Sequence, residues 1–480
     1  MKKNNLFLIL LIVVGFLVFV YTLPHFLKLV EILGKRIPQK NIRLDYVIGV
    51  AWAAFLGVTI YFWPVPSAHK KALGYIWMVK CFVMLGLMLF YEHHYQVDSY
   101  GYFNAATHHI REWRRMEVLG PSNPVILLIQ VLRNSFLDSF HAIKASFGMI
   151  GLFACYVFYL AAAEFLRRDI VRLLYVFALF PSILFWSSVI GKEPILLIAI
   201  AVYSYGVVKL IRTESFSSSV FIILGLITSV YIRLWLGIIL GLPVLLMVVR
   251  MMCLNRNSFK KIGYVLVFVS SIIILVFSTH GVTKIFYLKS FKDLSIFANK
   301  RFTTFSIGGS LLEAKPDGKM FKKADSGDNA LARDPKDPVG ENKPAYETAI
   351  DENSGVTVKI KYRGLKDLAL FVPRGVFTVL FRPLPGEVKN IFGLMAGLED
   401  TVLLILFIIA VFKVRWRELF TPFFIWAISL IVVWSIAYGF VGYNLGTVCR
   451  YRMQILPIFL GIILYFVFEK KGLGKPEIKE

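Results

Sequence analysis

The chain has 480 residues, 57% of them hydrophobic, and a mean hydropathy of +0.67. Soluble globular proteins contain about 45–50% apolar residues, so the composition excludes an ordinary soluble domain. The formal net charge is +24, but the basic residues form short clusters between apolar runs instead of one compact basic domain. The sequence therefore predicts a membrane protein and argues against nucleic acid as a partner.

Apolar runs recur along the whole chain, and runs of about 17–25 residues can each cross roughly 30 Å of hydrocarbon. A backbone in lipid must satisfy its hydrogen bonds within its own segment, and these runs are too uniformly apolar for barrel strands. The sequence therefore predicts an all-α polytopic membrane protein with about twelve transmembrane helices. The first run is longer than a signal-peptide core and lacks a small-residue cleavage site, so we interpret it as an uncleaved anchor. The expected spans lie near 5–23, 44–64, 73–91, 142–164, 171–190, 194–211, 217–232, 234–249, 262–279, 394–412, 419–440 and 453–469.

Clusters of lysine and arginine lie on one side of the predicted spans, as the positive-inside rule expects of cytoplasmic loops. They place both termini in the cytoplasm, and 92–141, 190–193 and 280–393 outside the cytoplasmic (inner) membrane. The connection 24–43 carries five basic residues on that outer side and is the exception. The clusters contain Lys70, Lys71, Arg167, Arg168, Lys209, Arg212, Arg250, Arg256, Lys260, Lys261, Lys413, Arg415, Arg417, Lys470 and Lys471.

This topology divides the chain into three parts. Residues 1–279 form an N-terminal transmembrane module that contains the first outer loop, 92–141. Residues 280–393 form an extracytoplasmic loop region, whose middle, 314–357, is rich in Lys, Asp, Gly, Pro and Asn and is predicted to be a mobile loop. Residues 394–480 form a C-terminal transmembrane module.

Two outer stretches are apolar but too short to cross the bilayer. Residues 124–132 are expected to form a re-entrant or interfacial helix, and 368–385 are expected to lie on the membrane surface.

The first outer loop is rich in groups that can transfer protons. Asp98 follows the third predicted span, with Tyr100, His93 and His94 close to it in sequence. A carboxylate at this position, beside aromatic and cationic side chains, can have a shifted pKa and act as a general base. The alternative interpretation is a solvated amphipathic helix with tyrosines at the membrane interface.

A metal site is a weaker interpretation of the same loop. His93, His94, His108 and His109 include no pair spaced i, i+4, and adjacent histidines point in different directions on a helix. No motif requires a cofactor, and the sequence leaves open whether a divalent cation takes part.

A second motif runs from Pro181 through Ser187-Ser188 to Lys192-Glu193. Glu193 stands where a helix N-terminus favours an anion, so helix capping is one interpretation. The functional alternative is that Lys192 and Glu193 face the same outer cavity as Asp98, because ionisable groups at a membrane cavity are costly.

A third motif, Arg450-Tyr451-Arg452, directly precedes the last predicted span. Two arginines on the outer side run against the positive-inside bias, and guanidinium groups bind phosphate bidentately. The alternative is that both side chains extend to the membrane interface. Other outer arginines that could join a phosphate site are Arg233, Arg374 and Arg382.

The order of these motifs resembles the GT-C glycosyltransferases, which are multi-spanning enzymes that use lipid-linked sugars. The resemblance rests on Asp98-x-x-x-Tyr102 with the following Ala105-Ala106, and on the Pro181 to Glu193 motif. It implies a polyprenyl-phosphate or polyprenyl-diphosphate sugar donor, a glycan or lipid-linked acceptor, and Asp98 as catalytic base. A C-terminal set, Pro373-Arg374-Gly375, 381–385, 397–399 and 450–452, looks similar to bacterial membrane proteins placed near GT-C enzymes or polysaccharide polymerases.

On this interpretation Arg450, Arg452 and Arg382 hold the donor phosphate while Asp98 takes the acceptor proton, and 314–357 closes over the acceptor. One alternative is a polymerase of O-antigen or exopolysaccharide repeat units, for which Arg382 and Gly393 match an Arg-x10-Gly spacing. A transporter or flippase would instead carry charges within spans and inverted repeats. Lys80 is the main charge we identify inside a span, and no repeat is evident. A non-catalytic scaffold is the remaining alternative.

Overall fold

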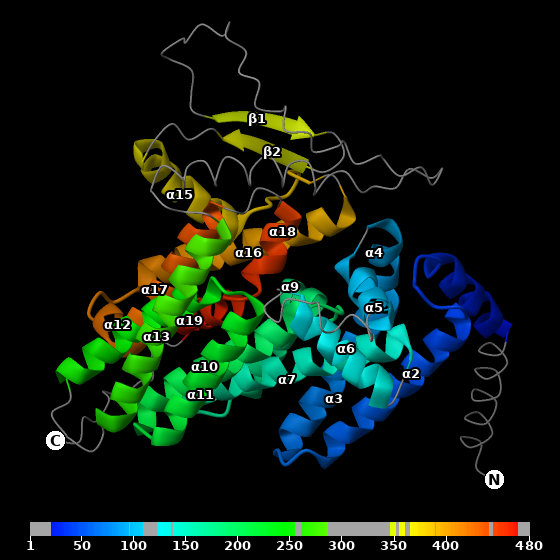
Figure 1. Cartoon of the computed structure of the whole chain (residues 1–480), viewed down its shortest axis with the longest axis horizontal. Helices are drawn as coiled ribbons and strands as arrows, with labels where there is room; N and C mark the ends of the chain where they lie inside the picture. Colours follow the sequence, from blue (N-terminus) through cyan, green and yellow to red (C-terminus); the bar gives the residue numbers. More distant parts are fainter. Residues whose placement is uncertain are drawn as a thin grey trace, which may run out of the picture. The chain divides into compact units, whose positions relative to one another are not determined.

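The computed structural model describes residues 21–95, 97–108, 122–135, 138–254, 261–286, 346–351, 355–360, 365–388, 390–440 and 445–468 (Figure 1). The chain divides into two compact units, and each is described by itself. Unit 1 comprises Met1–Gly237 and Val248–Ile274, and unit 2 comprises Ile238–Met247 and Leu275–Glu480. Two helices, α12 (Leu236–Leu254) and α13 (Lys261–Phe286), cross the division.

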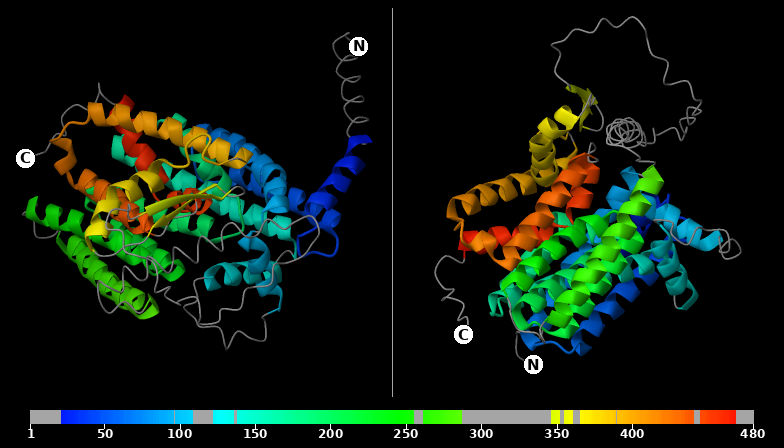
Figure 2. Two further views of the ribbon diagram at one scale, coloured as in Figure 1. Left: turned by 90° about the horizontal axis from the view of Figure 1, so that it is seen from above. Right: turned by 60° about the vertical axis from the view of Figure 1, so that its left-hand side comes forward.

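Unit 1 is built around the long helix α7 (Phe140–Leu166), which packs against α2, α8 and α10 and also contacts α3 and α6. Helix α10 in turn packs against α11, as the ribbons in Figures 1 and 2 show. The other elements are α2 (Ile42–Thr59), η1 (Ile60–Phe62), α3 (Ser67–Phe82), the π-helical turn η2 (Val83–Leu87), α4 (Met88–His94), α5 (Asp98–His108), α6 (Asn123–Ser135), α8 (Val171–Leu179), α9 (Pro181–Trp186), α10 (Lys192–Thr213) and α11 (Phe216–Ile232).

Unit 2 contains two principal helix pairs, α15 with α17 and α16 with α19. Helices α15 and α17 approach closely through Gly375 and Gly439, because a Cβ built on Gly375 would lie 3.3 Å from the Gly439 Cα. The elements are β1 (Tyr346–Asp351), β2 (Gly355–Ile360), α15 (Leu365–Phe381), α16 (Ile391–Lys413), η3 (Glu418–Phe420), α17 (Pro422–Gly439), α18 (Leu445–Arg452) and α19 (Leu456–Phe468).

Side-chain caps begin three of the long helices. The Asn41 side chain accepts a hydrogen bond from the Leu44 N–H at the start of α2, and Ser139 does the same for α7. Asn390 caps α16. These polar residues stand directly before apolar runs and satisfy backbone donors that have no partner within the helix.

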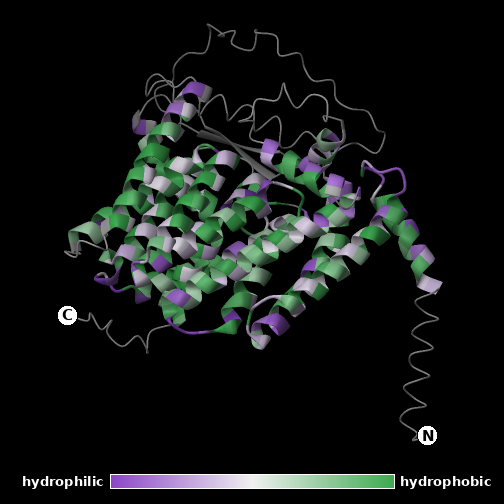
Figure 3. Ribbon diagram, turned by 60° about the horizontal axis from the view of Figure 1, so that its bottom comes forward, coloured by the Kyte–Doolittle hydropathy of each residue, from purple (hydrophilic) through white to green (hydrophobic). Residues whose placement is uncertain are grey.

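The chain is a multi-pass membrane protein. In its described part, eight helices are long and apolar enough to span a membrane, or nine if the bent pair α18 and α19 is one span. Hydrophobic residues cover most of the ribbon in Figure 3, and several spans expose large apolar side chains, such as Phe55, Ile273 and Ile405. Lipid is the solvent that accepts such a surface without cost.

The expectation of twelve spans is not confirmed, and the differences have local causes. The run expected at 171–190 is divided into α8 and α9, because Phe180 precedes Pro181 and leaves the helical region with a ψ of 124°. The run at 217–232 gives α11, which is 17 residues long. The last run bends by 71° between α18 and α19. Residues 5–20 of the first expected span lie outside the described residues.

The two short apolar stretches that were expected to lie outside the spans are helical. The apolar segment 124–132 lies inside α6, which packs against α5, and most of 368–385 lies in α15. An antiparallel hairpin pairs Tyr346 with Ile360 and Asp351 with Gly355, so the regular structure of the described residues is helical apart from these two strands. The hairpin occupies the end of the segment predicted as a mobile loop; 314–345 lie outside the described residues.

The α10–α11 contact makes a prediction about stability. A Cβ built on Gly225 would lie 2.6 Å from the Ala199 carbonyl oxygen and 2.6 Å from the Tyr203 Cβ, whereas one on Gly74 meets nothing within 4 Å. Gly225→Ala should therefore destabilise the detergent-solubilised protein by about 1–3 kcal/mol through overpacking. Gly74→Ala, the control, should leave the unfolding midpoint unchanged or raise it. Equal midpoints for the two variants would show that the helices do not pack this closely.

Candidate functional site

The predicted proton-transfer residues gather at one end of unit 1, where α2 and α7 begin, α4 ends and α5 begins. Asp45 of α2 holds the start of α7: its carboxylate accepts hydrogen bonds from the Phe140 N–H at 2.7 Å and the His141 N–H at 3.4 Å. The His141 Nδ1 lies 2.5 Å from the same carboxylate, and both side chains are buried. A carboxylate at a helix N-terminus is stabilised by the helix dipole, so Asp45 acts as a cap supplied by a neighbouring helix.

A buried ion pair lies beside this cap. The Lys144 ammonium donates to the Glu92 carboxylate at 2.7 Å, and the two side chains are 0% and 1% exposed. Each charge is strongly disfavoured at this depth without the other. The pair therefore joins the end of α4 to the first turn of α7 and determines where the chain enters α5.

Asp98, the predicted base, is the first residue of α5 and is exposed. Tyr100 is half-buried beside it, and its hydroxyl donates to the Glu92 carbonyl at 3.5 Å. Burial raises the pKa of the Tyr100 phenol above its ordinary value, and the Glu92 charge adds to this effect while Arg36 opposes it. Tyr100 therefore remains a neutral hydrogen-bond donor.

The two predicted histidines complete this end of α4. The His93 Nδ1 lies 3.1 Å from the Leu33 carbonyl oxygen, and the His94 Nδ1 lies 2.9 Å from that of Phe90. A carbonyl accepts only from a protonated nitrogen, so the Nε2 of each neutral ring is a hydrogen-bond acceptor.

The start of α10 lies beside α5. The Lys192 Nζ is 6.0 Å from the centroid of the Tyr102 ring, and Tyr102 lies one helical turn after Asp98 on the same face of α5. Glu193 is buried and pairs with the buried Arg233 at 3.3 Å. The structure thus brings Lys192 to the helix that carries Asp98, while Glu193 is used to join α10 to the end of α11.

The serines of the Pro181 to Glu193 motif lie deeper in unit 1. The Lys80 ammonium, midway along the continuous helix of α3, η2 and α4, donates to the Ser187 hydroxyl at 2.5 Å. A Cβ built on Gly151 of α7 would collide with the Ser187 carbonyl oxygen, so this turn packs directly against α7. Ser187 therefore accepts the hydrogen bond of the buried Lys80 and does not lie at the end of unit 1 where Asp98 lies.

Four of the arginines predicted to bind phosphate belong to unit 2: Arg374, Arg382, Arg450 and Arg452. Arg382 pairs with Glu387, with its Nη2 2.7 Å from the carboxylate. Arg452 is fully buried, pairs with Asp400 and donates to the Leu380 carbonyl at 3.0 Å and the Arg382 carbonyl at 3.4 Å. Arg374 and Arg450 are half-buried in α15 and α18. Arg452 thus ties the end of α15 to α16, whereas Arg450 lies nearer the surface.

Asp45, Lys144 and Asp400 were not recognised from the sequence, and the expectation that Lys80 is the main charge within a span was wrong. Asp45, Lys144 and Asp400 each stand inside an expected apolar run, at 44–64, 142–164 and 394–412. Such charges are rare in spans and could have been found by that position alone. What the sequence does not contain is their pairing, because Asp45 and His141 are separated by almost one hundred positions.

No group of three or more histidine, cysteine, aspartate or glutamate side chains suited to a metal ion occurs within the described ranges. Comparison with known proteins adds no family: no family model, curated protein or solved structure matches the chain.

The Glu92–Lys144 pair generates a prediction about stability. Lys144→Met leaves a buried carboxylate without its cation and should cost about 3–5 kcal/mol of unfolding free energy. The double variant Glu92→Met with Lys144→Met removes both charges and should recover most of this loss. Unfolding midpoints in detergent measure the effect.

The control is the exposed pair Arg43–Glu31, whose side chains are 52% and 50% exposed. Glu31→Gln should change the unfolding free energy by no more than about 1 kcal/mol. A double variant at Glu92 and Lys144 that is as unstable as Lys144→Met would show that the pair is needed for more than charge compensation.

Proposed function

We propose that the chain is an integral membrane glycosyltransferase that moves a sugar from a polyprenyl-phosphate or polyprenyl-diphosphate donor to a glycan or lipid-linked acceptor. The reaction takes place on the outer face of the cytoplasmic membrane, in the synthesis of a cell-surface polysaccharide or glycoconjugate. The single observation that carries this proposal is the position of Asp98, an exposed carboxylate at the start of α5. Tyr102, one helical turn further along α5, lies beside Lys192.

The surroundings of Asp98 suit a general base. The carboxylates of Asp45, Glu92 and Glu193 at this end of unit 1 are buried and each binds a cationic partner or a helix N-terminus. Asp98 is exposed and can reach an acceptor hydroxyl. Proton removal from that hydroxyl raises its nucleophilicity as the sugar–phosphate bond breaks, and the leaving phosphate carries away the bonding electrons.

The arginines of unit 2 are the proposed phosphate ligands because of the resemblance, and their contacts within unit 2 give them different roles. Arg450 and Arg374 are half-buried and supply positive charge for the donor phosphate, which stabilises the leaving group. Arg382 holds Glu387 and can exchange this carboxylate for phosphate. Arg452, buried on Asp400, is a positioning residue that holds the α18 segment in which Arg450 lies. His93, His94 and Tyr100 line the acceptor side.

Asp98→Asn tests the base. Loss of a general base lowers rates by about 10²–10⁴-fold, so the variant should lose transfer to that extent while its unfolding midpoint stays unchanged. The assay is sugar transfer in proteoliposomes supplied with a panel of polyprenyl-phosphate-linked and polyprenyl-diphosphate-linked sugars and an oligosaccharide acceptor.

Asp138→Asn is the matched control, because Asp138 is an exposed carboxylate that stands immediately before α7 and pairs with Arg133. It should retain transfer. If Asp98→Asn keeps near-normal activity, Asp98 is not the base.

Comparison of Arg450→Met with Arg452→Met separates phosphate binding from positioning. Removal of Arg452 leaves the buried Asp400 unpaired and should destabilise the protein by about 3–5 kcal/mol. Arg450→Met should raise the KM for the donor with a much smaller change in the unfolding midpoint. The reverse pattern would assign phosphate binding to Arg452.

A transporter or flippase is the second candidate, and the charges inside the spans favour it. Lys80, Lys144 and Asp400 are all buried within membrane helices, and ionisable groups there often mark ion or substrate paths. Each of these charges contacts a neighbouring segment of the protein, so a structural role explains them. Glycosyl transfer is therefore preferred to transport. The same proteoliposomes distinguish the two: a transporter moves the lipid-linked sugar to the other leaflet and leaves its glycosidic bond intact. A repeat-unit polymerase, the alternative within the enzyme class, gives a ladder of products instead of one added sugar.

A further inference from the structure

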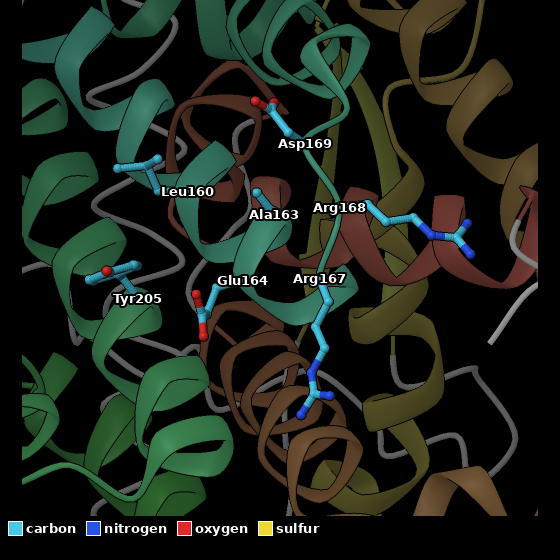
Figure 4. A pocket seen from close by; sticks show the side chains of 7 residues that line it. All are labelled: Leu160, Ala163, Glu164, Arg167, Arg168, Asp169 and Tyr205. Atoms are coloured by element: carbon cyan, nitrogen blue, oxygen red, sulfur yellow. The ribbon is translucent and has the colours of Figure 1, made fainter. Parts of the chain in front are cut away.

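The opposite end of α7 borders a pocket that the proposed transfer reaction does not use. The pocket has a volume of about 420 Å³ and lies where α7 ends beside α10 (Figure 4). Its lining consists of Leu160, Ala163, Glu164, Arg167, Arg168, Asp169 and Tyr205.

The length of α7 places this pocket at the level of lipid headgroups. The helix has 27 residues, and at 1.5 Å per residue it is about 40 Å long, against roughly 30 Å for hydrocarbon alone and 40–45 Å with headgroups. Glu164 lies in its last turn. Tyr205, on α10, is the kind of aromatic residue that favours the membrane interface.

Two opposite charges at the pocket have no partner within the protein. The side chains of Glu164 and Arg167 form no hydrogen bond or ion pair with any other residue in the described ranges, although they are only three positions apart. Figure 4 shows both side chains extending in a common direction, while Arg168 and Asp169 point to other sides of the turn. Arg167 also adopts a left-handed backbone with a φ of 53°, a conformation that favours glycine. The chain therefore keeps an arginine where its backbone conformation is costly.

The second carboxylate of the pocket is already occupied. Asp169 accepts a hydrogen bond from the Tyr159 hydroxyl, and its Oδ2 lies 3.0 Å from the Nε2 of the buried His69. These hydrogen bonds, first from Tyr159 and then from His69, hold the pKa of Asp169 below its ordinary value. Glu164 is thus the carboxylate available to a bound cation. Lys209 lies over the Tyr205 ring at 5.7 Å and adds positive charge beside the pocket.

We propose that this pocket binds the phosphoethanolamine headgroup of a zwitterionic phospholipid. The primary ammonium pairs with Glu164 and the phosphate pairs with Arg167, so both charges obtain a partner at headgroup depth. A glycerol headgroup would leave Glu164 without a cation. A choline headgroup carries the positive charge but has no N–H to donate.

The test is lipid binding to the full chain in detergent, measured by native mass spectrometry and by the shift in thermal unfolding midpoint. Phosphatidylethanolamine should bind more tightly than phosphatidylglycerol or phosphatidylcholine. Glu164→Gln should remove the preference over phosphatidylglycerol, a change on the order of tenfold for a lost charged hydrogen bond. Arg167→Gln should weaken both phosphatidylethanolamine and phosphatidylglycerol.

Two control variants and one soluble ligand test whether the preference belongs to this pocket and to a lipid. Glu31→Gln and Lys71→Gln remove exposed charges elsewhere in unit 1 and should leave the lipid preference intact. Soluble O-phosphoethanolamine should stabilise far less than the lipid; equal stabilisation would identify a soluble ligand and overturn the lipid assignment. Equal binding of all three lipids, unaffected by Glu164→Gln and Arg167→Gln, would overturn the proposal entirely. If Glu164→Gln fails to fold, Arg167→Gln tests the proposal alone, because undiminished phosphatidylethanolamine binding in that variant would overturn it.

Discussion

The central constraint on unit 1 is that charges buried among membrane helices must be paired. Asp45 caps α7 from α2, and Lys144 holds Glu92 at the end of α4. A buried charge without a partner costs several kcal/mol, so these contacts fix which helix ends meet. Apolar packing alone would not do so, because lipid tails are as apolar as the helix surfaces that they contact.

The same constraint separates structural charges from those available for chemistry. Glu92, Asp45 and Glu193 are held by partners that a substrate would have to displace. Asp98 begins α5 only a few residues after Glu92 and is exposed, which is why it is the carboxylate proposed to act on a substrate. In unit 2 Arg452 is buried and paired with Asp400, whereas Arg450, two positions earlier on α18, is half-buried.

Hydropathy alone predicts most of the spans, because α2, α7, α10, α16 and α17 coincide closely with apolar runs. It fails where a local rule overrides it. Pro181 divides one run into α8 and α9, and the residues around Arg452 bend another by 71°. The candidate residues Asp98, Lys192 and Arg450 can be named from the sequence because they stand beside spans, and their roles stay predictions. The residues that they contact cannot be predicted from the sequence, because the contact of Lys192 with Tyr102, for example, joins segments that lie ninety positions apart.

The two ends of α7 show how one helix can serve two unlike environments. At the beginning of α7 the buried side chains of His141 and Lys144 pair with Asp45 of α2 and Glu92 of α4, as burial demands. At its other end the side chains of Glu164 and Arg167 have none within the described part of the chain, and they line the pocket proposed to bind a lipid headgroup. Unpaired charges are inexpensive where water and lipid headgroups supply the counter-charge. The contrast is therefore a consequence of burial within unit 1 at the first end and of exposure at the last, which is where the proposed lipid headgroup would bind.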